Sequence, residues 1–369
     1  MGGGGVLDRD RLRPPRHPLR RLALLGADDL GLLPDRLQGR RGEGARLGTG
    51  VPRPLEQAVV AITGASSGIG RAASLRLARR GASLALCARS EGPLAEIAAE
   101  CEADGAEVFY RALDVSDEDA VEAFAAATVE RFGHLDVWVN NAGTIAYGPF
   151  EEIPSAVFRQ IIETNLMGQV HGARAALKRF REQGAGVLIN MSSVWGRVST
   201  PQVTPYIVSK NAVRAFSECL SGELVDEDGI HVATMVPQAV DTPIFEHAGN
   251  FTGKQVRPIP PVLDVEAVAE GIELCAENPK REVNYGQAGR ALEILHATAP
   301  PLYRRLAHGA FVRGSFGSVP ADPAPGNVLE SRGPYAAEGG WHARRERTLR
   351  RAFLEAAGAS VRGLFGKNS

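Results

Sequence analysis

The sequence predicts an α/β fold in which one doubly wound parallel sheet carries helices on both faces. The first observation is that short apolar runs rich in β-branched residues alternate with helix-period segments from about residue 57 to residue 286. The second is that a glycine-rich turn directly follows the first apolar run and begins a helical segment. Strands alternating with helices are typical of βαβ units, here giving about seven parallel strands in a single domain. Ligands are therefore expected at the carboxyl ends of the strands.

Each element follows from this alternation. The expected strands are 58–63, 82–88, 108–112, 135–140, 186–191, 230–236 and 283–285. The helical stretches expected between them are 69–80, 93–104, 117–131, 155–183, 203–226 and 264–277. The alternation stops after Gly286, so the catalytic domain is placed at residues 55–286.

The chain continues beyond this domain. A C-terminal helical extension is expected at residues 287–317, with an interruption at Pro300 and Pro301 because proline breaks a helix interior. Residues 318–369 are expected to be a largely disordered tail, in which 318–342 are rich in proline and glycine and are expected to be either loop or disorder. Within this tail, apolar residues recur at helical spacing over 343–365, which makes that stretch a candidate amphipathic helix.

Residues 1–54 differ from the rest of the chain. They open with Gly2 to Gly5, are dense in Arg, Pro and Gly, and show no sustained period. Such a segment buries too little apolar surface to offset its ordering entropy, so disorder is expected. A further hypothesis is that the natural product starts later, for example at Val51, and mass spectrometry of the natively expressed protein would test it.

The composition restricts the class of protein. Hydrophobic residues make up 44% of the 369 residues, which is ample for a large core. A net charge of −1 gives no overall field for nucleic acid, so none is expected as a partner. The four cysteines are scattered without metal-ligand spacing, so neither a disulfide framework nor a metal site is expected. No apolar run approaches the ~20 residues that span a bilayer, and the expected location is cytoplasmic.

A phosphate-binding turn is indicated by the segment Thr63 to Gly70, which reads TGASSGIG. Glycines at 64, 68 and 70 allow a tight turn, close approach of the backbone to a pyrophosphate, and close packing of helix on strand. The amino terminus of the following helix supplies N–H groups and a positive dipole end. The pattern predicts a Rossmann-like dinucleotide site.

The identity of the nucleotide depends on the end of the second strand. An acidic residue there would bind the 2′-hydroxyl of NAD. This chain has Leu86-Cys87-Ala88-Arg89-Ser90 instead, with no carboxylate. Arg89 can pair with a 2′-phosphate through charged hydrogen bonds, which favours NADP(H), while NAD(H) stays open. The alternative is that Arg89 is a solvated loop residue.

These motifs, in this order, resemble the short-chain dehydrogenase/reductase (SDR) family over residues 57 to about 286. The resemblance rests on TGxxxGxG at Thr63 to Gly70, on Asn140-Asn141-Ala142-Gly143, and on a YxxxK pair. It implies a catalytic set of Asn165, Ser193, Tyr206 and Lys210; Ser192 is a neighbouring candidate, but the step of thirteen residues to Tyr206 favours Ser193. The cofactor contacts that it implies are Gly64, Ser66, Ser67, Gly68, Ile69, Gly70, Arg89, Asp114, Val115, Asn141, Ala142, Gly143, Tyr206, Lys210, Pro237, Val240 and Thr242.

The residue types suit hydride transfer to a carbonyl. The carbonyl oxygen must receive a proton, and the reverse reaction needs a base. Lys210 lies one helical turn after Tyr206, and its ammonium is expected to lower the pKa of the tyrosine, which is ordinarily about 10. Ser193 is expected to hold the substrate oxygen near Tyr206. By resemblance, Lys210 also binds the nicotinamide ribose and Asn165 holds a water that relays protons.

The substrate side is less sharply defined. The segment Pro237 to Pro243 resembles the family's PGxVxT stretch, with Gln238 in place of glycine. Residues 244–262 occupy the usual position of a substrate lid and are loop-like. Tyr147, Trp195 and Phe245 are candidate pocket walls. His247 could touch substrate as well, although a mobile solvated loop is the competing interpretation.

The predicted function is an NADP(H)-dependent oxidoreductase (EC 1.1.1.-) that transfers hydride between nicotinamide and a small-molecule carbonyl or secondary alcohol. One alternative is a catalytically idle NADP(H)-binding regulatory protein, which would bind nucleotide without turnover. Another is a reductase that rests on a membrane surface through its C-terminal helices and acts on a lipid-like carbonyl. By resemblance a homodimer is expected, formed through the helical stretches 155–183 and 203–226.

Overall fold

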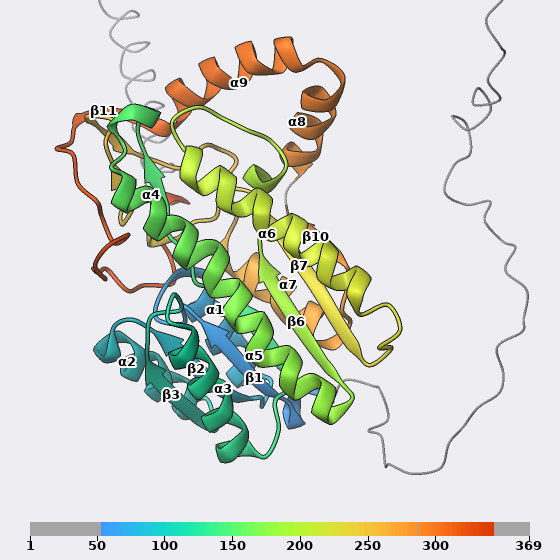
Figure 1. Cartoon of the computed structure of the whole chain (residues 1–369). Coiled ribbons are helices and arrows are strands. Elements are labelled where there is room, and N and C mark those ends of the chain that lie inside the picture. The colour runs from blue at the N-terminus through green and yellow to red at the C-terminus, as the bar shows by residue number, and fades with distance from the viewer. Residues whose placement is uncertain (1–52, 286, 343–369) are drawn as a thin grey trace, which may run out of the picture. The chain divides into compact units, whose positions relative to one another are not determined.

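A computed structural model describes residues 53–285 and 287–342 of the chain, and Figure 1 shows their arrangement around one central sheet. The sheet has seven strands in the order β10-β7-β6-β4-β1-β2-β3, and all neighbouring strands run parallel. These strands are β1 (Val59–Thr63), β2 (Ser83–Ala88), β3 (Val108–Ala112), β4 (Val137–Asn140), β6 (Gly186–Met191), β7 (Ile230–Pro237) and β10 (Glu282–Tyr285). The predicted doubly wound α/β fold is confirmed, because the strand order reverses beside β1.

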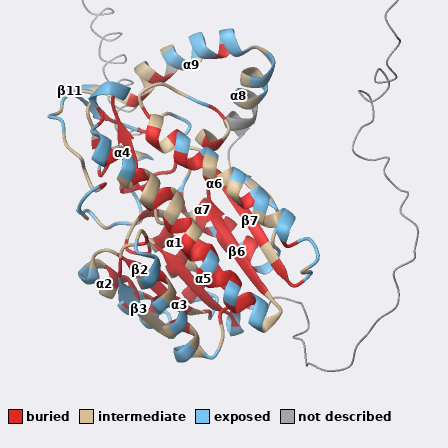
Figure 2. Ribbon diagram, in the orientation of Figure 1, coloured by how far each residue is buried: buried red, intermediate tan, exposed pale blue. Residues whose placement is uncertain are grey.

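Helices cover both faces of this sheet. The helices of the domain are α1 (Gly68–Arg79), α2 (Glu91–Ala103), α3 (Glu118–Phe132), α4 (Ser155–Ile162), α5 (Gly168–Gln183), α6 (Thr204–Glu223) and α7 (Val265–Glu277). Apolar residues of α1, α2 and α7 pack in one core cluster, and those of α3, α5 and α6 pack in a second. The sheet lies between the two clusters, and its five inner strands are almost entirely buried, whereas the edge strands β3 and β10 are partly exposed (Figure 2).

The strand pleat explains why the sheet corresponds to unbroken apolar runs. In β1, Val60 and Ile62 belong to the first cluster, whereas Val59 and Ala61 belong to the second. Successive side chains of a strand point to opposite faces, and both faces of this sheet are covered. Every residue of β1 is therefore buried.

The predicted helix at 155–183 is interrupted in the structure. Its first part is α4 and its last part is α5, and between them the chain forms a π-helical turn, η3 (Glu163–Met167). This turn contains Asn165, one of the predicted catalytic residues, and buries it completely. Such π turns add one residue to a helical turn and are frequent at functional sites. Sequence periodicity missed the turn because one extra residue barely disturbs the apolar pattern.

The predicted lid at 244–262 contains short pieces of regular structure. It begins with η5 (Pro243–Phe245), followed by β8 (Gly249–Asn250) and β9 (Lys254–Val256). Strand β8 pairs with β5 (Ala146–Tyr147), which follows β4. His247 is only 5% exposed, so the interpretation of a solvated loop is wrong at this position.

The C-terminal extension consists of two helices and a strand. Helices α8 (Gln287–Thr298) and α9 (Pro300–Ser315) are separated near Pro300, as predicted, and β11 (Phe316–Pro320) pairs antiparallel with β9. Residues 321–342 have little regular structure but are packed against the domain, with Val328 fully buried. The expectation of disorder is therefore wrong for 318–342, because tertiary contacts fix this segment where its sequence shows no period. The candidate helix 343–365 and residues 1–52 lie outside the described residues.

Candidate active site

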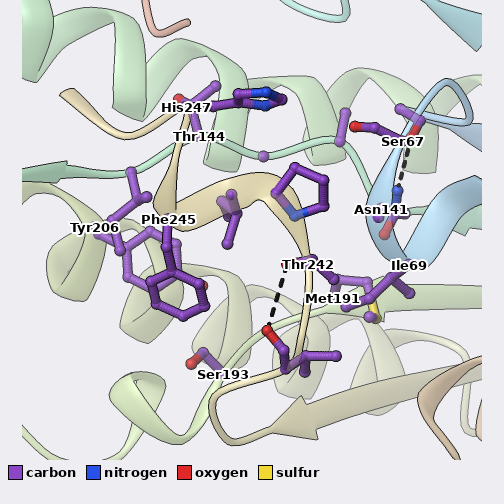
Figure 3. A pocket seen from close by; sticks show the side chains of 18 of the residues that line it. Ser67, Ile69, Asn141, Thr144, Met191, Ser193, Tyr206, Thr242, Phe245 and His247 are labelled. Carbon is purple, nitrogen blue, oxygen red and sulfur yellow. Dashed lines mark hydrogen bonds between the residues drawn. The ribbon is translucent and has the colours of Figure 1, made fainter. Parts of the chain in front are cut away.

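A cavity of about 300 Å³ lies at the carboxyl ends of the strands. It runs from the turn after β1 to helix α6 and the segment after β7, and the described C-terminal residues border it as well. Figure 3 shows Ser67 and Ile69 at one end of this pocket and Tyr206 and Phe245 at the other, with Thr242 and Met191 between them. The predicted nucleotide turn and three of the four predicted catalytic residues, Ser193, Tyr206 and Lys210, therefore share one cavity, whereas Asn165 is buried next to it.

The glycine turn is clamped to the segment after β4. The Thr63 hydroxyl accepts hydrogen bonds from the backbone N–H groups of Asn141 and Ala142, at 3.0 and 3.1 Å. The Asn141 amide donates in turn to the carbonyls of Thr63 and Gly64, at 2.9 and 3.2 Å. Asn141 therefore holds the turn in shape as well as lining the pocket.

Two glycines of this turn have a conformation that other residues rarely adopt. Gly64 and Gly68 have φ of +65° and +57°. A Cβ on Gly64 would lie 2.8 Å from the Ala142 Cα, and one on Gly68 would lie 3.4 Å from the Thr242 side chain, across the pocket. Glycine thus leaves space that a side chain would fill, and this cradle fits a pyrophosphate on the amino terminus of α1. The Gly68 N–H at this terminus already donates to the Ala336 carbonyl at 2.9 Å, so other N–H groups of the turn would bind the phosphates.

Gly70 has the predicted role of close helix packing, but it does not make the cofactor contact that the resemblance implies. It is absent from the pocket wall, whereas the other predicted cofactor contacts all line the cavity. A Cβ on Gly70 would lie 2.3 Å from the Gly64 carbonyl oxygen and 2.5 Å from the Asn141 amide nitrogen. Gly70 therefore allows α1 to pack closely on the turn without contacting the ligand space.

The end of the cavity where the resemblance places the adenosine lies at the ends of β2 and β3. The Asp114 carboxylate accepts hydrogen bonds from the Ser116 N–H and hydroxyl, at 2.9 and 2.7 Å, which fixes its orientation at the pocket wall. Arg89 also lines the pocket, but its guanidinium donates to the carbonyls of Asn327 and Val328, at 2.5 and 3.3 Å. Arg89 is therefore held by the C-terminal segment, and the alternative of a solvated loop residue is wrong.

The predicted catalytic side chains converge at the other end of the cavity. Ser193 follows β6, while Tyr206 and Lys210 lie one turn apart on α6. The Ser193 hydroxyl donates to the Pro237 carbonyl at 3.5 Å and accepts from the Trp195 N–H at 3.3 Å, and it lies near enough to the Tyr206 hydroxyl to lower the pKa of that group. The Lys210 Nζ donates to the Met191 carbonyl at 2.8 Å and lies 5.6 Å from the centre of the Tyr206 ring. The neighbouring Ser192 hydroxyl donates to the Lys210 carbonyl at 2.9 Å. Ser192 thus supports α6, and Ser193 is the serine that faces the tyrosine.

Burial moves the pKa values of both groups on α6. Desolvation of the Tyr206 hydroxyl raises its pKa to about 12, and the hydrogen bond from Ser193 opposes this rise only in part. Desolvation likewise lowers the pKa of Lys210 to about 8. The pKa of Tyr206 is therefore raised, and not lowered as expected from the nearby Lys210, because burial is the largest cause of the shift. At neutral pH this geometry presents a protonated phenol beside a charged lysine.

Asn165 is buried next to Lys210 and the loop after β4. Its amide nitrogen donates to the Thr144 carbonyl and the Ser209 hydroxyl, at 2.9 and 3.0 Å, and its oxygen accepts from the Thr144 N–H at 2.7 Å. A Cβ on Gly143 would lie 3.4 Å from the Asn165 oxygen and 3.6 Å from the Lys210 Nζ. Asn165 therefore fixes the loop after β4 next to Lys210.

Aromatic side chains form the wall on the substrate side. Tyr147, Trp195 and Phe245 all line the cavity, as predicted. The Trp195 ring meets the Tyr206 ring edge-on at 5.8 Å, and Phe311 of α9 stacks on Tyr147 at 6.5 Å. The C-terminal extension thus supports the wall from behind, which the sequence did not indicate.

Among the described residues that line the cavity, five have a buried polar side-chain atom without a hydrogen-bond partner; besides those of Thr144 and Gln238, three such atoms belong to the substrate side. They are the Tyr147 hydroxyl, the Ser315 hydroxyl and the His247 Nε2, and all three residues line the cavity. Burial and the nearby Tyr206 raise the pKa of Tyr147 well above its ordinary value, while burial lowers the pKa of His247. All three groups are therefore neutral at pH 7. Buried polar groups normally have partners, so these atoms are suited to contact a ligand.

Several other residues of the cavity wall were not predicted from the sequence. They are Ile259, Leu292, Ser315, Asn327, Ser331, Arg332 and Tyr335. All lie after the lid begins, in segments where the strand–helix alternation gives no guide to position. In the described part of the chain, no group of three His, Cys, Asp or Glu side chains could hold a metal ion. No described helix is long and apolar enough to cross a membrane.

Comparison with known proteins gives the family. A model described as short chain dehydrogenase matches residues 58–252. The uncharacterized oxidoreductase YxnA of Bacillus subtilis is 32% identical over 284 residues, which cover 76% of this chain and 80% of YxnA. A solved alcohol dehydrogenase from the archaeon Thermococcus sibiricus, complexed with 5-hydroxy-NADP, is 33% identical with a TM-score of 0.54, covering 62% of this chain and 95% of that one. A short chain dehydrogenase from Mycobacterium paratuberculosis bound to NAD is 25% identical with a TM-score of 0.58, covering 65% and 100%. The chain therefore belongs to the short-chain dehydrogenase family and is an oxidoreductase enzyme.

Proposed function

We propose that the enzyme reduces a carbonyl substrate to a secondary alcohol with NADPH, and that Tyr206 donates the proton. One observation carries this proposal: the Tyr206 hydroxyl, which lies near Ser193 and whose pKa burial raises to about 12, lines the same cavity as the phosphate cradle. A phenol with this pKa is fully protonated at neutral pH, so it suits the direction in which a proton is given. Oxidation of the alcohol is the reverse reaction and requires the phenolate.

The residues divide the work as follows. NADPH, when bound, supplies hydride to the carbonyl carbon. The Ser193 hydroxyl donates a hydrogen bond that holds the carbonyl oxygen beside Tyr206, and the Tyr206 hydroxyl gives that oxygen its proton. Lys210 is charged at neutral pH, and its ammonium stabilises the phenolate that Tyr206 becomes. Asn165 fixes the loop next to Lys210, and the aromatic wall keeps water from the reacting atoms.

Several features support NADP(H) over NAD(H). The end of β2 carries Arg89 and no carboxylate, and the Arg89 guanidinium lies at the adenosine end of the cavity. An arginine there attracts a 2′-phosphate, whereas a carboxylate would repel it. One solved relative binds a derivative of NADP and another binds NAD, so the choice depends on these local residues.

The substrate that fits this wall is a largely apolar carbonyl compound. Aromatic rings surround Tyr206, and the neutral Tyr147 and Ser315 hydroxyls offer hydrogen bonds to one further polar group. Among the cavity-lining residues, Lys210 is the charged group at the end near Tyr206. A charged substrate would therefore lose more hydration free energy than it recovers from contacts in this part of the cavity.

Substitution of Tyr206 tests the proposal. We expect Tyr206→Phe to lower the rate of NADPH-dependent ketone reduction by about 10²-fold or more, the contribution of a general acid, while NADPH binding is kept. A panel of apolar ketones followed by NADPH absorbance gives the rates, and fluorescence titration with NADPH gives the binding. A Tyr206→Phe variant as active as wild type would remove Tyr206 from the mechanism. Tight NADPH binding by wild type without turnover of any ketone or alcohol would favour the idle regulatory protein.

A second proposal concerns access to the site. Exposed apolar side chains gather on α8 and α9, where Leu292, Ile294, Leu302 and Leu306 are 40–58% exposed, and Leu292 also lines the cavity. This surface is suited to rest on a membrane from which a lipid-like carbonyl is drawn. We expect co-sedimentation with liposomes to be lost in Leu302→Gln/Leu306→Gln; equal sedimentation of variant and wild type, or none by either, rejects the idea.

We also propose a cytoplasmic homodimer. All four cysteines are unpaired and three are buried, which suits a reducing compartment. The predicted dimer would form through the outer surfaces of helices α4, α5 and α6, which correspond to the helical stretches expected at 155–183 and 203–226. Solution scattering that shows a tetramer or a monomer contradicts it.

A further inference from the structure

Residues 321–342, here called the strap, cross the carboxyl edge of the sheet on their way from β11. Backbone hydrogen bonds tie the strap to the lid: Ala324 pairs with Asn250 at 2.8 and 2.9 Å, and the Asn327 N–H donates to the His247 carbonyl at 2.8 Å. Val328 is fully buried among apolar residues of α4 and β5. The strap is therefore a fixed part of the fold at its beginning.

Its far end is anchored on the segment that follows β7. The buried Asp241 carboxylate, between Val240 and Thr242 of the pocket wall, accepts the N–H groups of Trp341 and His342, each at 2.9 Å. A hydrogen bond of 2.9 Å also joins the Gly68 N–H to the Ala336 carbonyl. The middle of the strap is thus held between two anchors, one on the lid and one after β7.

This middle part borders the nucleotide end of the cavity. Asn327, Ser331, Arg332 and Tyr335 all line it. The Tyr335 hydroxyl lies 3.1 Å from that of Ser90, the residue directly after Arg89, and 3.3 Å from that of Ser331. The strap therefore meets the enzyme where the ribose 2′ substituent of a dinucleotide is expected, at the end of β2.

Arg89 shows how closely the strap and this site are joined. Two of its guanidinium nitrogens donate to strap carbonyls of Asn327 and Val328, 238 and 239 positions away in the sequence. A guanidinium has five N–H donors, so donors are left for a phosphate after these two bonds. The strap therefore fixes the orientation of the Arg89 guanidinium and leaves N–H donors for a phosphate.

Arg332 brings a second positive charge to the same region. Its side chain is 55% exposed and pairs with Glu330 at 3.2 Å, and Glu330 is itself 75% exposed. A pair this exposed adds little stability, so Arg332 can exchange the carboxylate for a phosphate dianion. The cavity persists with the strap in place, and the strap forms a wall of it.

We propose that the strap completes the coenzyme site, and that Arg332 and Tyr335 bind the 2′-phosphate of NADP(H) together with Arg89. The inference rests on the proposed use of NADP(H). It adds two specificity-determining residues from beyond the domain that carries the family's motifs. The coenzyme is then recognised by both the end of β2 and the C-terminal extension.

Two adenosine fragments separate this idea from catalysis, because neither carries nicotinamide. Titration calorimetry on the full chain compares 2′,5′-ADP, which has the 2′-phosphate, with 5′-AMP, which lacks it. We expect Arg332→Gln to weaken 2′,5′-ADP binding by about tenfold or more, the loss of one charged hydrogen bond, and to leave 5′-AMP within about twofold. Tyr335→Phe should weaken 2′,5′-ADP by about threefold or more, since a neutral hydroxyl contributes less.

The matched control is Arg281→Gln. It removes the same charge from an exposed arginine, paired with Glu218, that does not line the cavity, and we expect it to change neither affinity. Unchanged 2′,5′-ADP affinity in both strap variants overturns the proposal. Tighter binding of both fragments also overturns it, since the strap would then obstruct the site.

The wild-type measurement shows which proposal has failed. If wild type does not distinguish 2′,5′-ADP from 5′-AMP, the preference for NADP(H) fails and the strap assignment fails with it. If wild type prefers 2′,5′-ADP and the strap variants keep that preference, only the strap assignment fails. Circular dichroism and thermal unfolding confirm that each variant is folded, so a loss confined to 2′,5′-ADP reports contact with the phosphate.

Discussion

Lys210 gives the sharpest quantitative prediction, because its lowered pKa lies inside the range in which enzymes are assayed. With a pKa of about 8, the charged fraction of Lys210 falls from about nine-tenths at pH 7 to about one-tenth at pH 9. The pKa of Tyr206 is about 12, so about one phenol in a thousand is ionised at pH 9. A change in rate between pH 7 and pH 9 therefore reports Lys210 and not Tyr206. If a charged Lys210 must stabilise the phenolate, kcat/KM for ketone reduction falls about tenfold over this interval.

The assay is a pH profile of kcat/KM for an uncharged ketone, with NADPH oxidation followed by absorbance. Lys210→Arg keeps a positive charge at all these pH values, so its profile should be flat between pH 7 and pH 9 even where its overall rate is lower. Lys280→Arg, at an exposed position, should follow the wild-type curve. The chain has few lysines, so isotope-labelled lysine NMR can follow the Lys210 titration directly, assigned by difference from Lys210→Arg. A flat wild-type profile refutes the reasoning, and so does an NMR midpoint that differs clearly from the kinetic one.

Two further predictions concern the wall and the strap. Tyr147→Phe removes a buried hydroxyl that has no hydrogen-bond partner. We therefore expect thermal unfolding to show equal stability or a gain of up to about 1 kcal/mol, and a clear loss of stability would contradict this. We also expect the KM to rise only for ketones that carry a second polar group. Gly326 has φ of +58°, and a Cβ there would lie 2.2 Å from the His247 carbonyl oxygen. Gly326→Ala should therefore cost about 1–3 kcal/mol of folding free energy, while Gly92→Ala, where nothing lies within 4 Å, should be neutral; equal melting temperatures would contradict the first expectation.

The sheet could be predicted from the sequence because its signals are local. Each strand is a short apolar run whose length and flanking residues identify it, and both faces of the sheet are covered, so even the edges of the runs agree closely with the structure. The sequence also indicated that Ser193, Tyr206 and Lys210 lie together, since they belong to one stretch that runs from the end of β6 into α6; their catalytic roles stay a prediction. The π turn around Asn165 was not, because it changes the backbone geometry while it leaves the sequence pattern intact.

The pKa values show a second limit of local reasoning. The one-turn spacing of Tyr206 and Lys210 suggests an ammonium that acidifies a phenol. The structure adds what spacing omits: Lys210 is almost fully buried, its Nζ donates to the Met191 carbonyl, and the ring of Trp195 packs against Tyr206. Burial penalises the charged form of both groups, which raises one pKa and lowers the other. The raised pKa keeps Tyr206 protonated at neutral pH, which suits a proton donor.

Arg89 shows why the sequence could not place the C-terminal extension at the site. In the sequence, Arg89 is a charged residue after a strand, and 318–342 are a proline- and glycine-rich stretch without a period. Their relation is a pair of hydrogen bonds across more than two hundred residues, and nothing in either segment alone encodes it. The strap satisfies its backbone groups on the lid, on Gly68 and on Asp241 instead of within a helix or sheet, so periodicity identifies no element there. Residues without a period can therefore be as firmly placed as a strand, and coenzyme recognition in this enzyme has to be tested at Arg332 and Tyr335 as well as at the family's motifs.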